Sequence, residues 1–407
     1  MTIKANPERA LRDLYHLRSI GTYKTGVHRP TLSEDDLITR HWLVGELKAI
    51  GHEAWIDGIG NVISKTPATG NKLLAGSHLE TQSHAGWLDG ALGVVYALEA
   101  ARAVVEAGRK DIGVEVFAFA DEEGHFGSFT GSRSLTGELT EADIDQRADR
   151  TTGRPLRQAI ADAGLSGVPR HRVDPARYIG MLEAHIEQGD WLESQKLQVG
   201  VVTSIVAIWQ YKIVFEGVQN HAGTTRMAIR KDAGVALRRF CQRVEERFPQ
   251  VCGERSVWTV GKIDLEPGAP SIIPGRASMT LQFRDADMAT LLRLEQTVGE
   301  LVDEANAAGP CTVSWETMNK NKPALMDEGI QAALEAAGGV YAPGKHARMP
   351  SGAGHDAQMM AQLMPAGMMF IPSIGGISHH WTEDTSDADI MLGAQVYADA
   401  VGRLLAR

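Results

Sequence analysis

Five residues have the types that bind divalent metal ions and lie where a strand-like pattern gives way to a glycine-containing loop: His78, Asp89, Glu123, His185 and His379. Imidazole and carboxylate are the ligands that zinc and neighbouring divalent ions prefer. A metal site that stays open to substrate has about three protein ligands per ion. Five ligands therefore suffice for two ions if one carboxylate is shared, and this set predicts a two-metal hydrolytic centre.

A further carboxylate, Glu122, stands beside Glu123 at the end of an alternating strand in VEVFAFADEEGHFGS, which begins at residue 114. Neighbouring side chains at a strand end diverge. One glutamate can therefore face a metal ion while the other takes a proton from water and passes it to a leaving nitrogen. We assign the ligand role to Glu123 and the general-base role to Glu122.

Each of these residues also has an ordinary structural interpretation. A single histidine in a loop is more often a surface or hydrogen-bonded residue than a ligand. Asp89-Gly90 can be a turn and helix cap, and Glu122-Glu123 can be a solvated strand end. The recurrence of such residues in strand-then-loop settings favours the metal centre over these alternatives.

Seven motifs follow one another along the chain: GSHLETQ, WLDGALGV, DEEG, EAHIEQG, NHAGTTRM, SGAGHDAQ and GISH. With them the chain resembles the zinc-dependent amidohydrolases that include N-carbamoyl-L-amino-acid hydrolase, allantoate amidohydrolase and β-ureidopropionase, a branch of the M20 metallopeptidase superfamily. The resemblance runs from RPTLSEDDLITRHWL near residue 29 to GGISHHWTEDTS, which ends at residue 386. It implies a dinuclear metal-dependent amidohydrolase that cleaves the C–N bond of an N-carbamoyl amino acid or a related ureido acid.

The resemblance also implies a metal set and its ligands. Two divalent ions are expected per subunit, with zinc as the expected metal and Mn, Co or Ni as alternatives. Asp89 would bridge the ions, and the terminal ligands would be His78, Glu123, His185 and His379.

Further residues match catalytic or substrate-binding positions of that family. Glu122 matches the general base, and His221 in NHAGTT matches a residue that reaches the active site of the neighbouring subunit of a homodimer to polarise the scissile carbonyl. Arg284 in MTLQFRDAD matches the arginine that holds the carboxylate of a small-molecule substrate, and Gly354 and His355 match a substrate-facing loop. Alternatively, Arg284 can pair with a neighbouring aspartate, and the segment around His221 can be only a turn.

The chain departs from the family pattern at three positions. Glu80 stands where the family usually has an aspartate that orients the imidazole of His78, so this carboxylate is one methylene longer. Trp209 replaces a glutamine, and Ser271 replaces an asparagine that contacts polar substrate groups, although Gln210 can stand in for one of them.

These departures keep other functions open. Trp209 and Ser271 can bind substrate, which favours an N-acyl-amino-acid hydrolase or an M20-type peptidase as the alternative activity, or Trp209 can serve packing alone. A catalytically silent binding relative is disfavoured, because such a protein has no physical reason to keep Glu122 beside an open metal site.

Periodicity and length predict two domains in the 407 residues. Strands alternate with helices up to about residue 205, which is typical of an α/β sheet covered on both faces. Alternating strands and two helical segments then follow. We therefore expect a mixed-sheet catalytic domain over residues 1–208 and 326–407, with an inserted α+β dimerisation domain over residues 209–325.

Composition excludes several other classes of protein. The net charge of −10 gives no basic surface for nucleic acid. No segment approaches the roughly 18 uninterrupted apolar residues of a membrane span, and no signal peptide is evident. Three scattered cysteines predict neither a disulfide framework nor a cysteine metal site. We expect a cytoplasmic enzyme.

Overall fold

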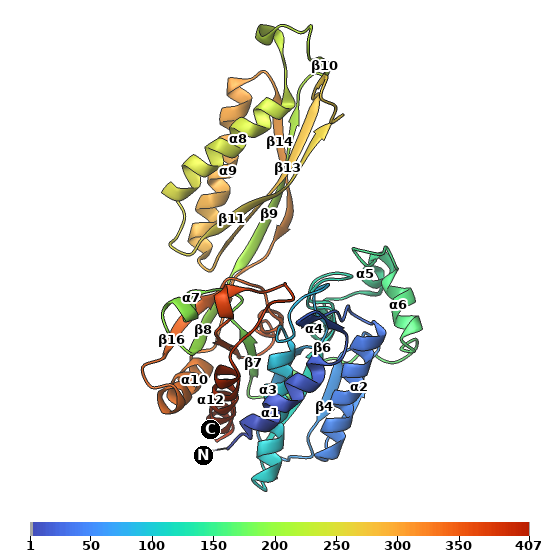
Figure 1. Cartoon of the computed structure of the whole chain (residues 1–407), viewed down its shortest axis with the longest axis vertical. Helices are drawn as coiled ribbons and strands as arrows, with labels where there is room; N and C mark the ends of the chain where they lie inside the picture. Colours follow the sequence, from blue (N-terminus) through green and yellow to red (C-terminus); the bar gives the residue numbers. More distant parts are fainter. Residues whose placement is uncertain (1–2, 407) are drawn as a thin grey trace. The chain divides into compact units, whose positions relative to one another are not determined.

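The computed structural model describes residues 3–406, and the chain divides into two compact units (Figure 1). Unit 1 comprises Met1–Ser204 and Leu325–Arg407, and unit 2 comprises Ile205–Ala324. The borders thus fall after residues 204 and 324, whereas the sequence predicts them after residues 208 and 325.

A nine-stranded mixed sheet forms the centre of unit 1, in the order β15-β8-β17-β7-β5-β6-β4-β3, with β16 paired to β8. Strands β17, β7, β5 and β6 run parallel, whereas β8, β4 and β3 pair antiparallel to their neighbours. The strands are β3 (Glu53–Ile56), β4 (Val62–Lys65), β5 (Lys72–His78), β6 (Gly113–Phe119), β7 (Met181–Ile186), β8 (Val199–Ile205), β15 (Ala324–Leu325), β16 (His346–Ser351) and β17 (Ala366–Ile371). A separate hairpin pairs β1 (Thr22–Tyr23) with β2 (Gly26–Val27).

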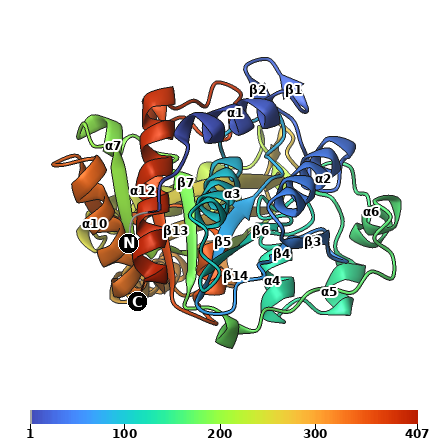
Figure 2. The same cartoon turned by 90° about the horizontal axis from the view of Figure 1, so that it is seen from below.

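Helices cover this sheet, as the sequence predicts. They are α1 (Pro7–Arg18), α2 (Glu34–Ala49), α3 (Ala91–Glu106), α4 (Thr130–Thr136), α5 (Glu141–Gln146), α6 (Leu156–Asp162), α7 (Trp191–Ser194), α10 (Glu328–Tyr341), α11 (Asp356–Met360) and α12 (Asp387–Leu405). Helices α1, α3 and α12 pack on one another (Figure 2), and α3 lies on β5, β6 and β7. Helices α4 and α11 contact each other and the strands β6, β7 and β17.

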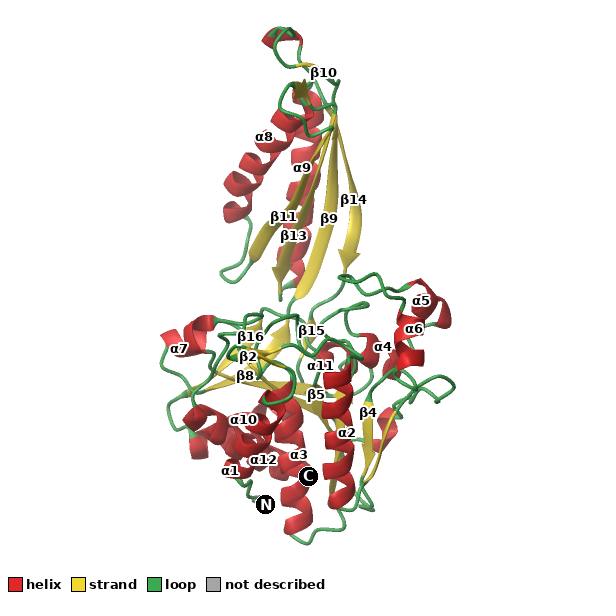
Figure 3. Cartoon of the chain, turned by 45° about the vertical axis from the view of Figure 1, so that its right-hand side comes forward, coloured by secondary structure: helices red, strands yellow, loops and turns green. Residues whose placement is uncertain are grey.

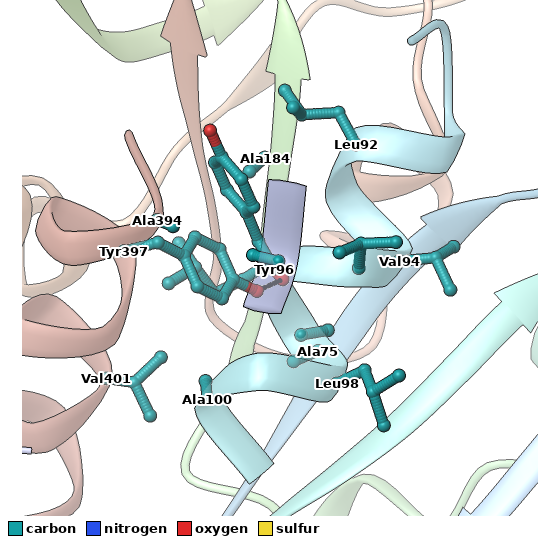
Figure 4. Close-up of a cluster of buried hydrophobic side chains, with 14 of the residues drawn as sticks. Ala75, Leu92, Val94, Tyr96, Leu98, Ala100, Ala184, Ala394, Tyr397 and Val401 are labelled. Atoms are coloured by element: carbon teal, nitrogen blue, oxygen red, sulfur yellow. Dashed lines mark hydrogen bonds between the residues drawn. The ribbon is translucent and has the colours of Figure 1, made fainter. Parts of the chain in front are cut away.

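Helix α3 is buried on every side, because its apolar residues continue around the whole helix. Figure 4 shows Tyr96 of α3 beside Tyr397 of α12, together with small side chains of β5 and β7. The three charged residues of α3 have partners: Glu99 and Glu106 accept hydrogen bonds from Arg9, and Arg102 pairs with Asp13 at 2.5 Å. This buried helix begins at Ala91, two residues after Asp89, so it fixes the loop that carries that carboxylate.

Unit 2 is a four-stranded antiparallel sheet with two helices on one face (Figure 3). The strands lie in the order β11-β13-β9-β14, with bounds β9 (Ala207–Glu216), β11 (Val257–Glu266), β13 (Arg276–Asp285) and β14 (Thr312–Lys320). Helices α8 (Ala233–Arg247) and α9 (Met288–Ala308) cover the face where alternate residues are buried. A short pair of strands, β10 (Asn220–His221) and β12 (Ile272–Ile273), extends from this sheet.

Short 3-10 helices complete the described chain: η1 (Pro175–Arg177), η2 (Met227–Ile229), η3 (Phe248–Gln250) and η4 (Ile374–Gly376). Over residues 3–406, no helix combines the length and the apolar character that crossing a membrane requires.

Candidate metal centre

The parallel strands of unit 1 bring the predicted residues to one edge of the sheet. His78 is the last residue of β5, His185 lies next to the end of β7, and Glu122 and Glu123 follow β6 by three and four residues. The carboxyl ends of parallel strands meet at a common edge, where α/β proteins commonly place their sites.

Asp89 is the centre of the arrangement. Its Oδ1 atom lies 3.4 Å from His78 Nε2 and 3.0 Å from His185 Nε2, whereas Oδ2 lies 3.4 Å from His379 Nε2. The residues form two groups, His78-Asp89-His185 and Asp89-Glu123-His379, with the ligand atoms of each group within 4.8 Å of one another. A carboxylate with one oxygen in each of two groups has the geometry that a bridging ligand needs.

Glu123 shows that these side chains fit a metal ion. Its Oε1 atom is buried and accepts no hydrogen bond from any residue in the described part of the chain. Its Oε2 atom lies 3.6 Å from His379 Nε2. A buried carboxylate oxygen without a partner is costly, and a cation at the Asp89-Glu123-His379 group would satisfy it.

Local backbone geometry allows this close approach. Gly90 has φ +71°, and a Cβ atom at this position would lie 2.3 Å from Nδ1 of His78. Only glycine can follow Asp89 without displacing the imidazole. The glutamate pair lies between two further residues of positive φ, Asp121 at 58° and Gly124 at 72°, which turn the chain sharply after β6.

The contacts of Glu80 differ from the prediction that its carboxylate orients His78. Nδ1 of His78 lies 3.0 Å from the main-chain oxygen of Glu80 and 3.9 Å from its carboxylate. The carboxylate instead accepts from Arg40 at 2.6 Å and from the backbone nitrogen of Glu122 at 2.6 Å. The longer side chain therefore supports the general-base candidate, while the main chain orients the imidazole.

The charges of this site perturb one another. Burial opposes ionisation of Asp89, but hydrogen bonds with His185, His379 and His78 outweigh it and hold the pKa of Asp89 well below its usual range. The hydrogen bond with Asp89 raises the pKa of His379 to about 9. Burial raises the pKa of Glu122 well above its ordinary value, although the nearby His78 opposes this shift.

Three residues outside the predicted ligand set support the centre. Gln188 donates to Asp89 Oδ2 at 3.0 Å, and buried Glu383 accepts from the backbone nitrogen of Asp89 at 3.1 Å. Gln82 donates to Glu123 Oε2 at 2.7 Å. Gln82 and Gln188 lie in the motifs GSHLETQ and EAHIEQG, and Glu383 lies in the segment GGISHHWTEDTS, but the residue types alone gave no reason to single them out.

The SGAGHDAQ loop lies in unit 1, beside the centre. His355 is buried, and its ring packs edge-on against His185 with centroids 4.7 Å apart. Its Nε2 atom lies 3.0 Å from the hydroxyl of Ser351. A Cβ atom at Gly354 would approach the ring of Phe129 to 2.8 Å. The ring of His355 is thus close to a ligand candidate, and the predicted contact of this loop with substrate stays a prediction.

In unit 2 the structure separates Trp209 from Arg284. Trp209 is 1% exposed in the core under the helices, and its indole nitrogen donates to the main-chain oxygen of Asn321 at 2.7 Å. Arg284 lies on the opposite, partly exposed face of the sheet, where it donates to Gln282, and Gln210 is the cross-strand neighbour of Gln282. We therefore correct the expectation that Trp209 contacts substrate: it serves packing, and Gln210 shares the face of Arg284.

His221 lies in β10, and Ser271 directly precedes the partner strand β12. The main-chain oxygen of Ser271 accepts from the backbone nitrogen of Ala222 at 2.9 Å, and His221 pairs with Ile272. Nδ1 of His221 accepts hydrogen bonds from the backbone nitrogens of Gly223 at 3.0 Å and Thr224 at 3.2 Å. In the neutral ring the proton must then reside on Nε2, which leaves an exposed N–H donor.

His221 and Arg284 lie at opposite ends of the unit 2 sheet. His221 pairs beside Ile272, before β13 begins at Arg276, whereas Arg284 is the ninth residue of that strand. Eight residues of antiparallel strand span about 27 Å. His221 and Arg284 of the same copy of unit 2 therefore cannot contact the same small molecule.

The mixed sheet gathers histidines and carboxylates at the ends of its parallel strands, and one carboxylate is shared between two groups. This arrangement is typical of metal-dependent hydrolases. The sequence pattern of Peptidase family M20/M25/M40 matches residues 76–403, and the chain belongs to this family.

Known proteins resemble the chain over nearly its whole length. The N-carbamoyl-L-amino-acid amidohydrolase of Paenarthrobacter aurescens is 33% identical over 97% of both chains. The allantoate amidohydrolase of Bacillus subtilis is 32% identical over 90% of this chain and 92% of its own. The solved structure of an amidase of the hydantoinase/carbamoylase family from Burkholderia phymatum has a TM-score of 0.92 and 42% identity, covering 100% of this chain and 99% of its own. The family resemblance and the mixed α/β fold predicted from the sequence are confirmed.

Proposed function

We propose that this chain is a dinuclear metal-dependent amidohydrolase that cleaves the C–N bond of an N-carbamoyl amino acid or a related ureido acid. The observation that carries the proposal is Asp89, whose two carboxylate oxygens face two separate groups of ligand candidates. The named activities of the relatives from Paenarthrobacter aurescens and Bacillus subtilis support a ureido substrate over a peptide.

The donor set suits two divalent ions per subunit, for which zinc is the expected metal and manganese, cobalt or nickel are alternatives. Asp89 would be shared, His78 and His185 would hold one ion, and Glu123 and His379 would hold the other. When bound, such ions supply Lewis acidity toward a carbonyl and lower the pKa of water.

Glu122 would act as the general base and then as the acid. Its side chain is only 10% exposed, and Oε2 lies 3.7 Å from His78 Nε2, so the carboxylate faces the ligand candidates without being needed as one. Burial raises the pKa of Glu122, which makes its carboxylate a better proton acceptor, and the group would take a proton from water and return it to the leaving nitrogen.

The substrate contacts would come from unit 2 of two subunits. Arg284 offers a planar fork that matches a carboxylate, and the Nε2 proton of His221 can donate to a developing oxyanion. Because about 27 Å of strand separates the two residues, we propose a homodimer in which His221 of one subunit completes the site of the other.

A panel of substrates tests this function. One amino acid would be supplied in N-carbamoyl, N-acetyl and dipeptide form to enzyme loaded with zinc, and release of the free amino acid would be measured. We expect the highest kcat/KM for the N-carbamoyl form and no turnover by chelator-treated enzyme. A higher kcat/KM for the N-acetyl form would instead establish an acyl-amino-acid hydrolase, and cleavage of the dipeptide alone would establish a peptidase.

A further inference from the structure

Gln82 makes two hydrogen bonds to a ligand candidate without being a candidate itself. Its Nε2 atom donates to Oε2 of Glu123 at 2.7 Å and to the main-chain oxygen of Glu123 at 3.0 Å. The residue lies in the loop between β5 and α3, which also carries Asp89. Gln82 therefore joins the loop of one ligand candidate to the side chain of another.

Arg150 fixes the orientation of this amide. Nη2 of Arg150 donates to Oε1 of Gln82. Since arginine has only donors, the carbonyl end of the amide must face Arg150, and the NH₂ end must face Glu123. A flipped amide would place a carbonyl oxygen against the Glu123 carboxylate and two NH₂ hydrogens against a guanidinium.

The segment that carries Arg150 is itself well anchored. The backbone nitrogen of Arg150 donates to the main-chain oxygen of His125 at 2.8 Å, and Nε2 of His125 lies 2.9 Å from the main-chain oxygen of Thr81. Oδ1 of Asp149 accepts from the backbone nitrogens of Thr151 at 2.9 Å and Thr152 at 2.7 Å. Arg150 thus projects from a tight turn toward the residue that follows Thr81.

We propose that Arg150 and Gln82 form a positioning pair that holds the carboxylate of Glu123 in place beside Asp89 and His379, so that it can serve the ion of the Asp89-Glu123-His379 group. This inference rests on the proposed function, because it presupposes a metal ion at that group. It is based on a difference between the two carboxylate oxygens of Glu123. Oε2 accepts a hydrogen bond from Gln82, whereas buried Oε1 has no hydrogen-bond partner among residues 3–406.

The two groups differ in how firmly their histidines are held. His78 and His185 are buried, and Nδ1 of each lies within 3.0 Å of a main-chain oxygen, at 3.0 Å and 2.8 Å respectively. The side chain of His379 is 51% exposed. The Asp89-Glu123-His379 group therefore depends more on a fixed Glu123. Loss of the positioning pair should lower the affinity for the ion of this group and leave the affinity for the other ion unchanged.

Metal titration tests the pair without relying on turnover. Metal-free wild type, Arg150→Met and Gln82→Leu would be titrated with Zn²⁺ against a competing chelator to resolve two binding steps. In both variants we expect the affinity of one step to fall about 10- to 100-fold, the usual effect of removing a group that orients a ligand. The other step should keep the wild-type affinity.

Three comparisons separate positioning from general damage. Arg154→Met is the matched control, because Arg154 lies in the same turn but pairs with Asp162, and it should bind both ions as the wild type does. The double variant should lose no more affinity than Gln82→Leu, since the two residues act in series. Arg150→Lys, which keeps a hydrogen-bond donor, should bind the ion more tightly than Arg150→Met does. The melting temperature of each metal-free protein shows whether the variant is folded.

Unchanged affinities at both steps, or an equal loss at both steps in well-folded variants, would overturn the positioning pair. Wild-type protein that binds fewer than two ions would instead overturn the proposed dinuclear centre, and the pair with it. The two failures are therefore distinguishable in one set of titrations.

Discussion

At the scale of single residues, the site holds carboxylates whose pKa values move in opposite directions within one buried cluster. Hydrogen bonds with three histidines keep Asp89 ionised, although burial opposes this. Burial instead raises the pKa of Glu122 well above its ordinary value. A pair of groups whose environments separate their pKa values is suited to different roles. Asp89 is suited to hold cations, and Glu122 is suited to carry a proton.

Replacing Glu122 by glutamine separates these roles. Glutamine keeps the size of the side chain but cannot accept the proton, so we expect kcat to fall by a factor on the order of 100 or more. Metal content, measured by elemental analysis, should stay at the wild-type value. Glu106→Gln, at a carboxylate that is 54% exposed, is the control and should leave kcat unchanged. Loss of a metal ion from Glu122→Gln would show that Glu122 and Glu123 have been assigned the wrong way round.

At the scale of secondary structure, periodic patterns predicted most of the fold. The alternating strands expected after residue 205 correspond to β9, β11 and β13, and the two helical segments correspond to α8 and α9. These elements have one face in a core and the other in solvent, which is the arrangement that leaves a periodic signature.

Contacts between distant loops could not be predicted in this way. Glu383 supports the backbone of Asp89 across 294 residues, and no local pattern records such a pairing. The positive φ of Gln188 could not be predicted from the sequence either, because glutamine does not require this conformation. Whether Trp209 contacts substrate or packs in the core was left open, because a strand has a period of two and the face of each residue depends on an exact register.

The open face of the unit 2 sheet leads to a prediction about specificity. Arg284 is half-buried and flanked by Gln282, and lysine cannot reproduce its two parallel donors to a carboxylate. A hydrogen bond to a charged group contributes about 1.5 to 3 kcal/mol. We therefore expect Arg284→Lys to lower kcat/KM about 10- to 100-fold for substrates with a free carboxylate.

Two controls accompany this substitution. The same substrates with the carboxylate converted to an amide should lose little between wild type and Arg284→Lys. Arg276→Lys changes an arginine of the same strand that pairs with Glu216 and Glu266 at the surface, and it should have no effect. An equal loss on acids and amides would place Arg284 outside carboxylate recognition.

At the scale of the whole molecule, one copy of the chain is not sufficient for the proposed chemistry. The ligand candidates and Glu122 belong to unit 1, whereas the exposed donor of His221 and the fork of Arg284 lie at opposite ends of unit 2. In a two-fold symmetric dimer, one end of unit 2 of each subunit could contribute to the site of its partner, so that His221 and Arg284 of different subunits complete one site.

Subunit exchange tests this arrangement. His221→Ala and Glu122→Ala should each be inactive alone. In a mixed dimer, one site would combine the wild-type Glu122 of one chain with the wild-type His221 of the other. Equal mixing should restore about a quarter of wild-type activity, since half of the dimers are mixed and each has one intact site. A mixture of Glu122→Ala with Glu122→Gln, which share the same defect, should stay inactive. Absence of recovery, after exchange is verified by mass spectrometry of differently tagged chains, would place His221 in the site of its own subunit or outside catalysis.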